Sequence, residues 1–402
     1  MVASRKRLTS GINMDLSKRI TGLTGDGDDG WGIFIKARRM KAAGKPVLEL
    51  TIGEHDDRTE QIILDKMHAA ASGGHTGYAM VPGTDALRET VAKRIEERTG
   101  VRTTPANIMI TPGGQSALFA SHAAVCDHGD TAMYIDPYYA TYPGTIRGVG
   151  AVPLPVQARS RNDFQPDIAD LEAAITPGVK SLMINSPNNP TGVVYSRDTL
   201  EGLADFAKKH DLWLISDEVY DTQIWEGEHI SPRALPDMKE RTLVIGSMSK
   251  SHAMTGSRIG WVCGPEAVVA NLITLATHTT YGVAGFIQDA AKFALEQGEG
   301  FEEKVAAPFR RRREIAKSLL EGQNSVKLIP AGGAMYLMLD IRATGLSGED
   351  FAEDLLEQEL IAVMPGESFG AASAGHIRLA MTIPDDQFKD AFARLIKFAA
   401  DK

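Results

Sequence analysis

Cysteine is scarce in this sequence of 402 residues, with only Cys126 and Cys263 present. Two cysteines cannot build a disulfide framework, and such sparse use is typical of a reducing compartment, so we expect a cytoplasmic protein. Long apolar runs are missing as well. The longest stretch without a charge, residues 267–288, contains Asn271, His278 and four threonines. It is too polar for a membrane span, and it predicts a helix followed by a loop.

An excess of positive charge is also lacking. The formal net charge is -9 and the sequence pI is about 5.6, which argues against nucleic acid as the principal partner. Basic residues at positions 5–7 have no apolar run behind them, so the amino terminus does not resemble a secretory signal. Met14 is an alternative start to Met1.

Two short patterns superficially suggest metal sites. The segment Gly25–Gly30 has the acidic spacing of a calcium loop but lacks its glycine and its bidentate glutamate, so we expect a flexible turn there. His122, Cys126 and His128 lie close together in sequence without a visible fourth ligand. We therefore expect no metal.

The chain is long enough for one large domain and a smaller one. Short apolar runs alternate with helical patterns as far as residue 285, which predicts a mostly parallel sheet with helices on both faces. A long helical pattern at 286–320 then leads to a second region with two strands and two helices. We expect an α/β protein with an amino-terminal arm and helix (1–45), a large domain (46–285) and a small α/β domain (286–402). The helix near 31–43 should pack on the small domain.

The segment from Ser247 to Gly260 is the richest in chemistry. Lys250 lies there among small, weakly charged neighbours, where desolvation can lower its pKa and free the amine to attack a carbonyl. Arg258 and the serines of this segment could hold a phosphate. A second candidate for anion binding is the glycine-rich turn 111–116, because it opens a helix expected to end at Cys126.

Two earlier apolar runs end in polar side chains. The run 213–216 is followed by Asp217 and Tyr220, and the run 181–184 leads into a segment that contains Asn189. Because ligands bind where parallel strands end, we expect these side chains to meet Lys250 at one edge of the sheet.

Three motifs in this order resemble the signature of the class I and II aminotransferases, members of the fold type I pyridoxal-phosphate family. They are SPNNPTG (186–192), SDEVY (216–220) and SMSKSHAMTGSRIGW (247–261). The resemblance extends from Leu48 to Arg378. It implies a fold type I architecture, pyridoxal 5'-phosphate as cofactor, and transfer of an α-amino group from an L-amino acid to a 2-oxo acid through pyridoxamine phosphate. It also implies a homodimer with shared active sites, and no nucleic-acid or membrane partner.

The resemblance also implies a role for individual residues. Lys250 would bind the cofactor and move a proton, Asp217 would keep the pyridine nitrogen protonated, and Tyr220 would hydrogen-bond the ring hydroxylate. Asn189 would contact both the ring and the substrate. Tyr139 would stack on the ring, with Tyr138 as the alternative. The implied phosphate ligands are Gly114, Gln115, Ser247, Ser249, Arg258 and, from the partner subunit, Tyr78. The implied substrate carboxylate ligands are Gly53 and Arg378.

The substrate is less well defined by the sequence. The segments SKSHAMTG, TGLSGEDFAEDLL and AGHIRLA are most similar to arginine–pyruvate aminotransferases. The loop after the strand 47–52 resembles the family's GEPD loop, with His55 in place of the proline. An acidic group of this loop, Glu54, Asp56 or Asp57, is then expected to meet a cationic substrate side chain. No second arginine for a dicarboxylate is apparent in 277–282.

Other functions remain open. They are an aspartate, aromatic or alanine aminotransferase, a pyridoxal-phosphate-dependent C–S β-lyase of the same fold, and a regulator that uses the fold to sense a ligand. The regulator is disfavoured because the segment before Val47 is too short for a DNA-binding module. The arginine run 310–313 is expected to be a solvated helix face.

Overall fold

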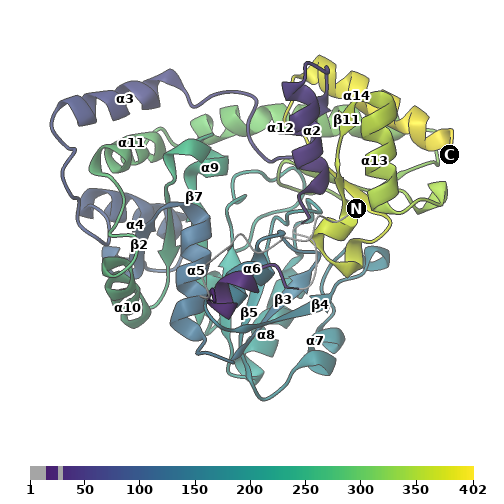
Figure 1. Cartoon of the computed structure of the whole chain (residues 1–402). Helices are drawn as coiled ribbons and strands as arrows, with labels where there is room; N and C mark the ends of the chain where they lie inside the picture. The colour runs from purple at the N-terminus through teal and green to yellow at the C-terminus, as the bar shows by residue number, and fades with distance from the viewer. Residues whose placement is uncertain (1–14, 26–29) are drawn as a thin grey trace.

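The computed structural model describes residues 15–25 and 30–402, so most of the loop predicted at Gly25–Gly30 lies outside the described residues. A seven-stranded sheet forms the centre of the larger part of the molecule (Figure 1). Its strands all run parallel except β8, which is antiparallel to both of its neighbours. In spatial order they are β2 (Ile108–Thr111), β8 (Gly260–Cys263), β7 (Thr242–Ser247), β6 (Trp213–Asp217), β5 (Val179–Asn185), β3 (Thr131–Asp136) and β4 (Val152–Gln157).

Helices cover both faces of this sheet, because its strands are apolar on both sides. Leu182 and Ile184 of β5 pack in one core, and Met183 between them packs in the opposite core. The helices of this part are α3 (Gln61–Ser72), α4 (Asp85–Thr99), α5 (Gly113–Val125), α6 (Tyr142–Gly148), α7 (Ile168–Ala174), α8 (Arg197–Lys209), α9 (Met248–Ser251), α10 (Glu266–Thr277) and α11 (Gly285–Leu295). The predicted alternation of strands and helices is therefore confirmed.

The long helical pattern predicted at 286–320 is two helices, α11 and α12 (Glu299–Leu320), because Gly298 adopts a left-handed φ of 76° between them. Helix α12 leads into a second sheet that is antiparallel throughout. The strands of this sheet are β12 (Met364–Pro365), β13 (His376–Ala380), β10 (Tyr336–Asp340) and β9 (Lys327–Leu328). Helices α13 (Gly348–Glu359) and α14 (Asp385–Ala400) cover it.

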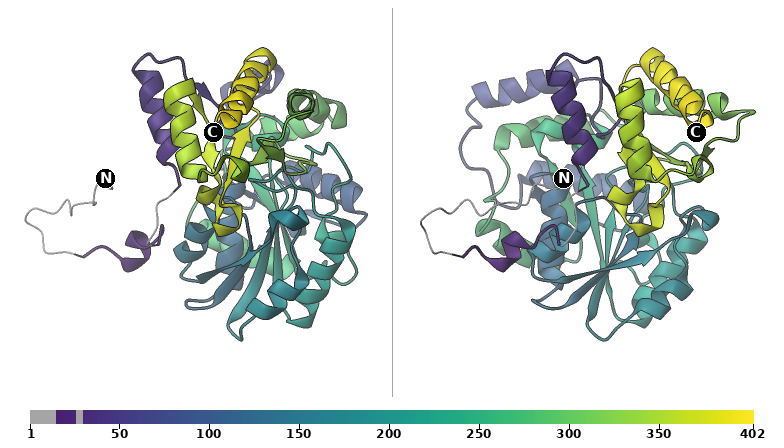
Figure 2. Two further views of the ribbon diagram at one scale, coloured as in Figure 1. Left: turned by 90° about the vertical axis from the view of Figure 1, so that its right-hand side faces the viewer. Right: turned by 45° about the vertical axis from the view of Figure 1, so that its right-hand side comes forward.

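The amino-terminal segment contributes to this second part. After the short helix α1 (Lys18–Thr21), helix α2 (Gly32–Ala42) buries Ile33 and Ala37 in the same core as α13 and α14. Figure 2 shows α2 beside these helices of the carboxy-terminal region. The strand predicted at 47–52 has only two residues, β1 (Leu48–Glu49). It pairs in parallel with β11 (Ile361–Ala362), so a strand from the range predicted for the large domain joins the carboxy-terminal region.

Only half of the arginine run on α12 is the solvated face that the sequence suggested: the side chains of Arg310 and Arg311 are 45% and 57% exposed. The side chains of Arg312 and Arg313 are only 3% and 4% exposed, because α12 crosses between the two parts of the molecule and is covered on several sides. Both guanidinium groups are neutralised by carboxylates, those of Asp56 and Glu226 among them. Arginines at buried positions need such partners.

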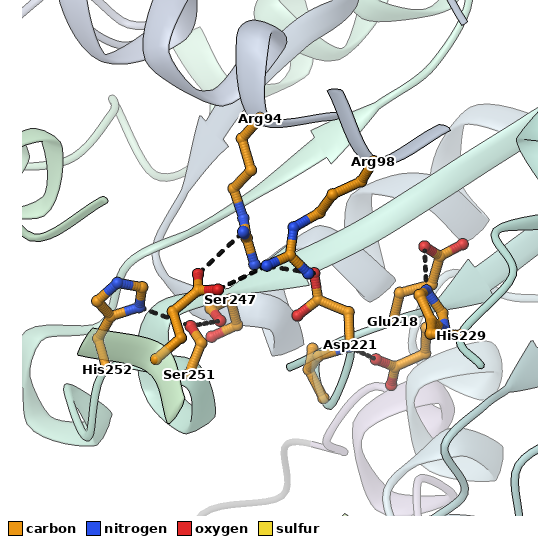
Figure 3. A network of polar contacts seen from close by, with 11 residues as sticks. Arg94, Arg98, Glu218, Asp221, His229, Ser247, Ser251 and His252 are labelled. Atoms are coloured by element: carbon orange, nitrogen blue, oxygen red, sulfur yellow. Dashed lines mark hydrogen bonds and ion pairs between the residues drawn. The ribbon is translucent and has the colours of Figure 1, made fainter. Parts of the chain in front are cut away.

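A second, partly buried cluster of ion pairs ties α4 to the start of α12. Arg94 and Arg98 of α4 both contact the carboxylates of Asp221 and Glu302, at distances of 2.5 to 3.0 Å. Figure 3 shows the two arginines converging on Asp221. Two cations and two anions balance one another, which is the condition for burying such groups. Because Asp221 follows Tyr220 directly, the cluster also fixes the turn after β6.

None of the helices in the described ranges is long and apolar enough to cross a membrane. The same ranges contain no group of three side chains placed to bind a metal ion. His122 lies inside α5, where burial lowers its pKa to about 4 and its Nε2 is 3.3 Å from the sulfur of Met183.

Candidate active site

A cavity of about 280 Å³ lies where the central parallel strands end. Strands β5, β6 and β7 end there at Asn185, Asp217 and Ser247. Every site residue predicted from the sequence except Tyr78 lines this cavity. These residues are Gly53, Gly114, Gln115, Tyr139, Asn189, Asp217, Tyr220, Ser247, Ser249, Lys250, Arg258 and Arg378.

Lys250 reaches the cavity from the short helix α9. The helix begins directly after β7, and the hydroxyl of Ser247 caps it by accepting the N–H of Ser249 at 3.1 Å. The Lys250 amine donates to the carbonyl oxygen of Gly53, and its own carbonyl accepts from the side chain of Gln223. The reactive amine thus lies on a fixed backbone beside the Gly53 loop.

Asp217 is the buried acid of the cavity. Burial raises the pKa of its carboxyl group to about 6, although a hydrogen bond from the Tyr142 hydroxyl, 2.6 Å away, works against that rise. Asp217 forms no ion pair with any residue that the structure describes. A buried carboxylate of this kind is suited to a ligand that carries an N–H proton. Tyr142 was not predicted as a site residue, because nothing in its sequence context distinguishes it from the other tyrosines of 136–142.

The structure separates the two tyrosines proposed for stacking on the cofactor ring. Tyr139 lines the cavity, whereas Tyr138 packs edge-on against Tyr134 and donates its N–H to the carbonyl of Phe369 on the far side. Tyr220 also lines the cavity, with its hydroxyl 3.0 Å from that of Tyr336. Tyr336 is a further lining residue that sequence reasoning did not assign to the site.

One end of the cavity is suited to an anion. Helix α5 begins there, and its N-cap, Pro112, offers no side-chain acceptor, so the first backbone N–H groups face the cavity uncapped. The guanidinium of Arg258 lies so close that a Cβ on Gly113 would be 2.4 Å from it. With the hydroxyls of Ser247 and Ser249, these groups form a donor set for a phosphate.

The other end of the cavity holds a second arginine. Arg378 of β13 is fully buried between the rings of Tyr336 and Phe369, which lie 4.5 and 4.3 Å from its guanidinium carbon. It donates to Asn189 and to the carbonyl of Thr51, and its Nε has no partner among the described residues. A buried cation whose protein partners are neutral can bind a carboxylate in two places at once.

The cavity therefore contains the Lys250 amine and the Asp217 carboxylate, and each of its two ends has a set of anion-binding donors, here called an anion cup. An amino-acid site with a phosphorylated cofactor requires these groups. The model of the class I and II aminotransferase family matches residues 45–395. The chain belongs to the class I and II aminotransferases.

Individual relatives agree with this membership. The arginine–pyruvate transaminase of Pseudomonas aeruginosa is 38% identical over 96% of this chain and 98% of its own. The aspartate/prephenate aminotransferase of Thermus thermophilus is 36% identical over 90% of this chain and 93% of its own. Among solved structures, the Thermus thermophilus aspartate aminotransferase with maleate has a TM-score of 0.89 at 34% identity, covering 96% of this chain and all of that one.

These comparisons confirm the predicted fold type I architecture and the predicted cofactor, pyridoxal phosphate. The residues of the aminotransferase cavity fit that cofactor: the cup at α5 suits its phosphate, the Asp217 carboxylate suits its ring nitrogen, and the Lys250 amine suits its carbonyl carbon. The roles of single residues stay predictions.

Among the three acids considered for substrate recognition, the aminotransferase presents only Glu54 to the cavity. Glu54 accepts a hydrogen bond from the Thr255 hydroxyl at 3.2 Å. The carboxylate of Asp56 instead faces Arg312, and Asp57 is exposed and outside the cavity.

Tyr78 lies apart from the cavity of its own chain. It is 92% exposed and packs edge-on against Tyr281, whose ring centre is 5.2 Å away. So large an exposed aromatic surface is suited to a contact with another chain.

Proposed function

We propose that this aminotransferase transfers the α-amino group of a cationic L-amino acid, arginine, to pyruvate. The observation that carries the proposal is Glu54, a carboxylate on the cavity wall. The cations that line the cavity in the described ranges are Lys250, Arg258 and Arg378. Lys250 and Arg258 belong to the cofactor and Arg378 to the α-carboxylate, so no further cation is left there for a distal carboxylate. The similarity to the Pseudomonas arginine–pyruvate transaminase supports the same donor.

We further propose a role for each group around the cofactor. Bound pyridoxal phosphate supplies an electron sink for the pair released at the substrate Cα. Asp217 accepts a hydrogen bond from the protonated ring nitrogen, which keeps that charge in place. Lys250 anchors the cofactor and afterwards carries the Cα proton as a general base and acid. Tyr220 and Asn189 donate to the ring oxygen.

The substrate is positioned by groups at the other end of the cavity. Arg378 binds the α-carboxylate as a bidentate pair, with the Gly53 backbone beside it. Asn189 links the two ends, because its side-chain oxygen accepts from Arg378 at 2.9 Å. Tyr139 covers the ring and excludes water. We propose that Tyr78 completes the phosphate site from the partner subunit of a homodimer.

The test of the reaction is a panel of half-reactions. The purified, cofactor-loaded protein is mixed with one L-amino acid at a time without an acceptor, and the absorbance of the cofactor is followed. Fastest conversion by arginine or lysine supports the proposal, and pyruvate is then tested as acceptor. Fastest conversion by aspartate, an aromatic amino acid or alanine contradicts the proposed donor. Pyruvate released from cysteine or cystathionine without any acceptor would instead reveal a β-lyase.

The contribution of Glu54 is tested by Glu54→Gln. The neutral side chain keeps its size but loses its attraction for a cationic substrate, so kcat/KM for arginine should fall by roughly 10-fold while that for alanine stays unchanged. Asp57→Asn is the matched control, since it removes an exposed charge of the same loop outside the cavity. Equal losses for arginine and alanine would contradict a role in donor selection.

A further inference from the structure

The guanidinium group of Arg312, outside the cavity, is held by several hydrogen bonds at once. It forms a two-pronged pair with Asp56, with Nη1–Oδ1 and Nη2–Oδ2 distances of 2.8 and 2.7 Å. Its Nε donates to Asp385 at 2.8 Å, and Nη1 also donates to the carbonyl of Met381 at 2.8 Å. The arginine side chain is 3% exposed and that of Asp56 is 18% exposed. A planar guanidinium with this many partners has a single orientation.

These partners belong to separate segments of the chain, two of which adjoin residues of the cavity. Asp56 lies two residues after Glu54, in the loop that also presents Gly53. Met381 follows β13, the strand that carries Arg378. Asp385 opens α14. One side chain on α12 therefore connects the loop that faces the substrate to the strand that bears the carboxylate-binding arginine.

Hydrogen bonds to β13 and to the residue Thr382 beyond it hold the beginning of this loop. The N–H of Ala380 donates to Leu50 and the Thr382 hydroxyl donates to Ile52, which attaches the chain to β13 as far as residue 52. Residues 53–57 belong to no helix or strand. Within the loop, the Lys250 amine donates to the Gly53 carbonyl and the Thr255 hydroxyl donates to Glu54. The next two residues are fixed against α12, through the His55 ring on Phe309 and through the pair of Asp56 with Arg312.

We propose that Asp56 and Arg312 are a positioning pair that sets the place of Gly53 and Glu54 at the cavity, and thereby the affinity for the amino donor. The pair touches neither cofactor nor substrate. The inference rests on the proposed function in that Gly53 and Glu54 are the groups that meet the donor. It also changes the role of Asp56, which the sequence offered as a direct contact for a cationic side chain.

The test is Asp56→Asn in the cofactor-loaded enzyme. The amide preserves the size of the side chain but cannot maintain the charged, two-pronged pair. KM should rise by about 10-fold for arginine and for alanine alike, with kcat changed less than about twofold, because the loop binds every donor. Binding of 2-methylalanine, which has no α-hydrogen to lose, should weaken by the same factor when followed through the cofactor absorbance.

Arg311→Gln is the matched control. Arg311 neighbours Arg312 and also pairs with Asp385, but its side chain is 57% exposed and it does not contact Asp56. This variant should leave KM for both donors unchanged. If Asp56→Asn does not fold, Asp56→Glu serves in its place, since it keeps the charge and displaces the loop by one methylene; it should raise KM for both donors.

The outcomes separate this inference from the proposed donor. An unchanged KM in the Asp56 variants, a loss for arginine alone, or a fall in kcat with loss of bound cofactor would each overturn the positioning role. If the Asp56 variants weaken all donors while Glu54→Gln does not affect arginine, the positioning role stands and the choice of arginine as donor fails.

Discussion

The carboxylate of Asp217 and the hydroxyl of Tyr142 form a deeply buried polar pair of the cavity, 2.6 Å apart. In the proposed function this pair serves the bound cofactor and not the stability of the free protein. Tyr142 supplies one hydrogen bond, and the Val219 N–H supplies another at 3.3 Å, yet burial still dominates the pKa of Asp217. Without the cofactor, the charge of this group therefore opposes folding.

Because the charge of Asp217 opposes folding, the stability of the cofactor-free protein should depend on pH. The folded-state pKa of Asp217, about 6, lies above its ordinary value of 3.8, so the folded protein holds the proton more tightly than the unfolded chain. Stability of the cofactor-free protein should therefore fall as pH rises from about 4 to about 6, by about 3 kcal/mol from this group. Asp217→Asn removes the effect. Urea unfolding should find this variant more stable than the wild type at pH 8, with the difference vanishing near pH 4.

Asp57→Asn is the control for this experiment, because Asp57 is an exposed aspartate. Its free energy of unfolding should follow the wild type at every pH. A difference between Asp217→Asn and wild type that is the same at pH 4 and pH 8 would contradict the assignment to charge burial.

At the scale of single elements, the start of α5 and the side chain of Arg258 depend on one another. Gly113 has a φ of 77°, a conformation that side chains other than glycine rarely adopt, and it leaves room for the guanidinium beside it. The helix therefore begins with free N–H groups next to a cation, and a phosphate would meet both together.

Gly113→Ala should consequently weaken the binding of pyridoxal phosphate. The added methyl group would lie 2.4 Å from Nη2 of Arg258 and would force the guanidinium out of the anion cup. We expect the dissociation constant of the cofactor to rise by roughly 10-fold or more, measured by equilibrium dialysis against the cofactor-free protein. Gly129→Ala is the matched control, because Gly129 has a φ of 88° and no neighbour within 4 Å of the added Cβ. Both variants should be destabilised, but only Gly113→Ala should lose affinity.

The elements that the sequence predicted best are those whose pattern is local. The buried runs that form β5, β6 and β7 are short and apolar, and the polar residues that follow them have to face the ligand edge of a parallel sheet. Asp217, Asn189 and Lys250 can therefore be located from the sequence alone.

The contacts that could not be predicted from the sequence are those between residues far apart in the chain. Arg312 can be buried because it forms ion pairs with Asp56 and Asp385, which belong to two remote segments. The residue pattern of α12 alone does not indicate those partners. Tyr142 contacts Asp217 across 75 positions of sequence. The partner of β1 is equally distant, at β11.

At the scale of the whole molecule, the surface around Tyr78 predicts assembly. Met80, which is 67% exposed, and Tyr281 extend the apolar surface of Tyr78 on one side of the molecule. If Tyr78 serves the neighbouring active site, an inactive Lys250→Ala subunit and a weakened Tyr78→Ala subunit should complement each other. Mixed under conditions that exchange subunits, they should regain activity, because each mixed dimer contains one intact site. Activity that stays at the sum of the separate variants would show that each chain works alone.

The pairing of β1 with β11 also has a consequence for the order of synthesis. Strand β1 and helix α2 leave the ribosome early, but Ile361 and Ala362 follow only after the whole seven-stranded sheet has been made. At a synthesis rate of ~5–20 residues per second, the apolar side of α2 lacks its packing partners for roughly 15 to 60 s. During that interval the central sheet can already fold, while the amino-terminal segment is still unpaired and can bind chaperones. Slowed translation before residue 361 should therefore expose the nascent chain to proteolysis near its beginning rather than in its centre.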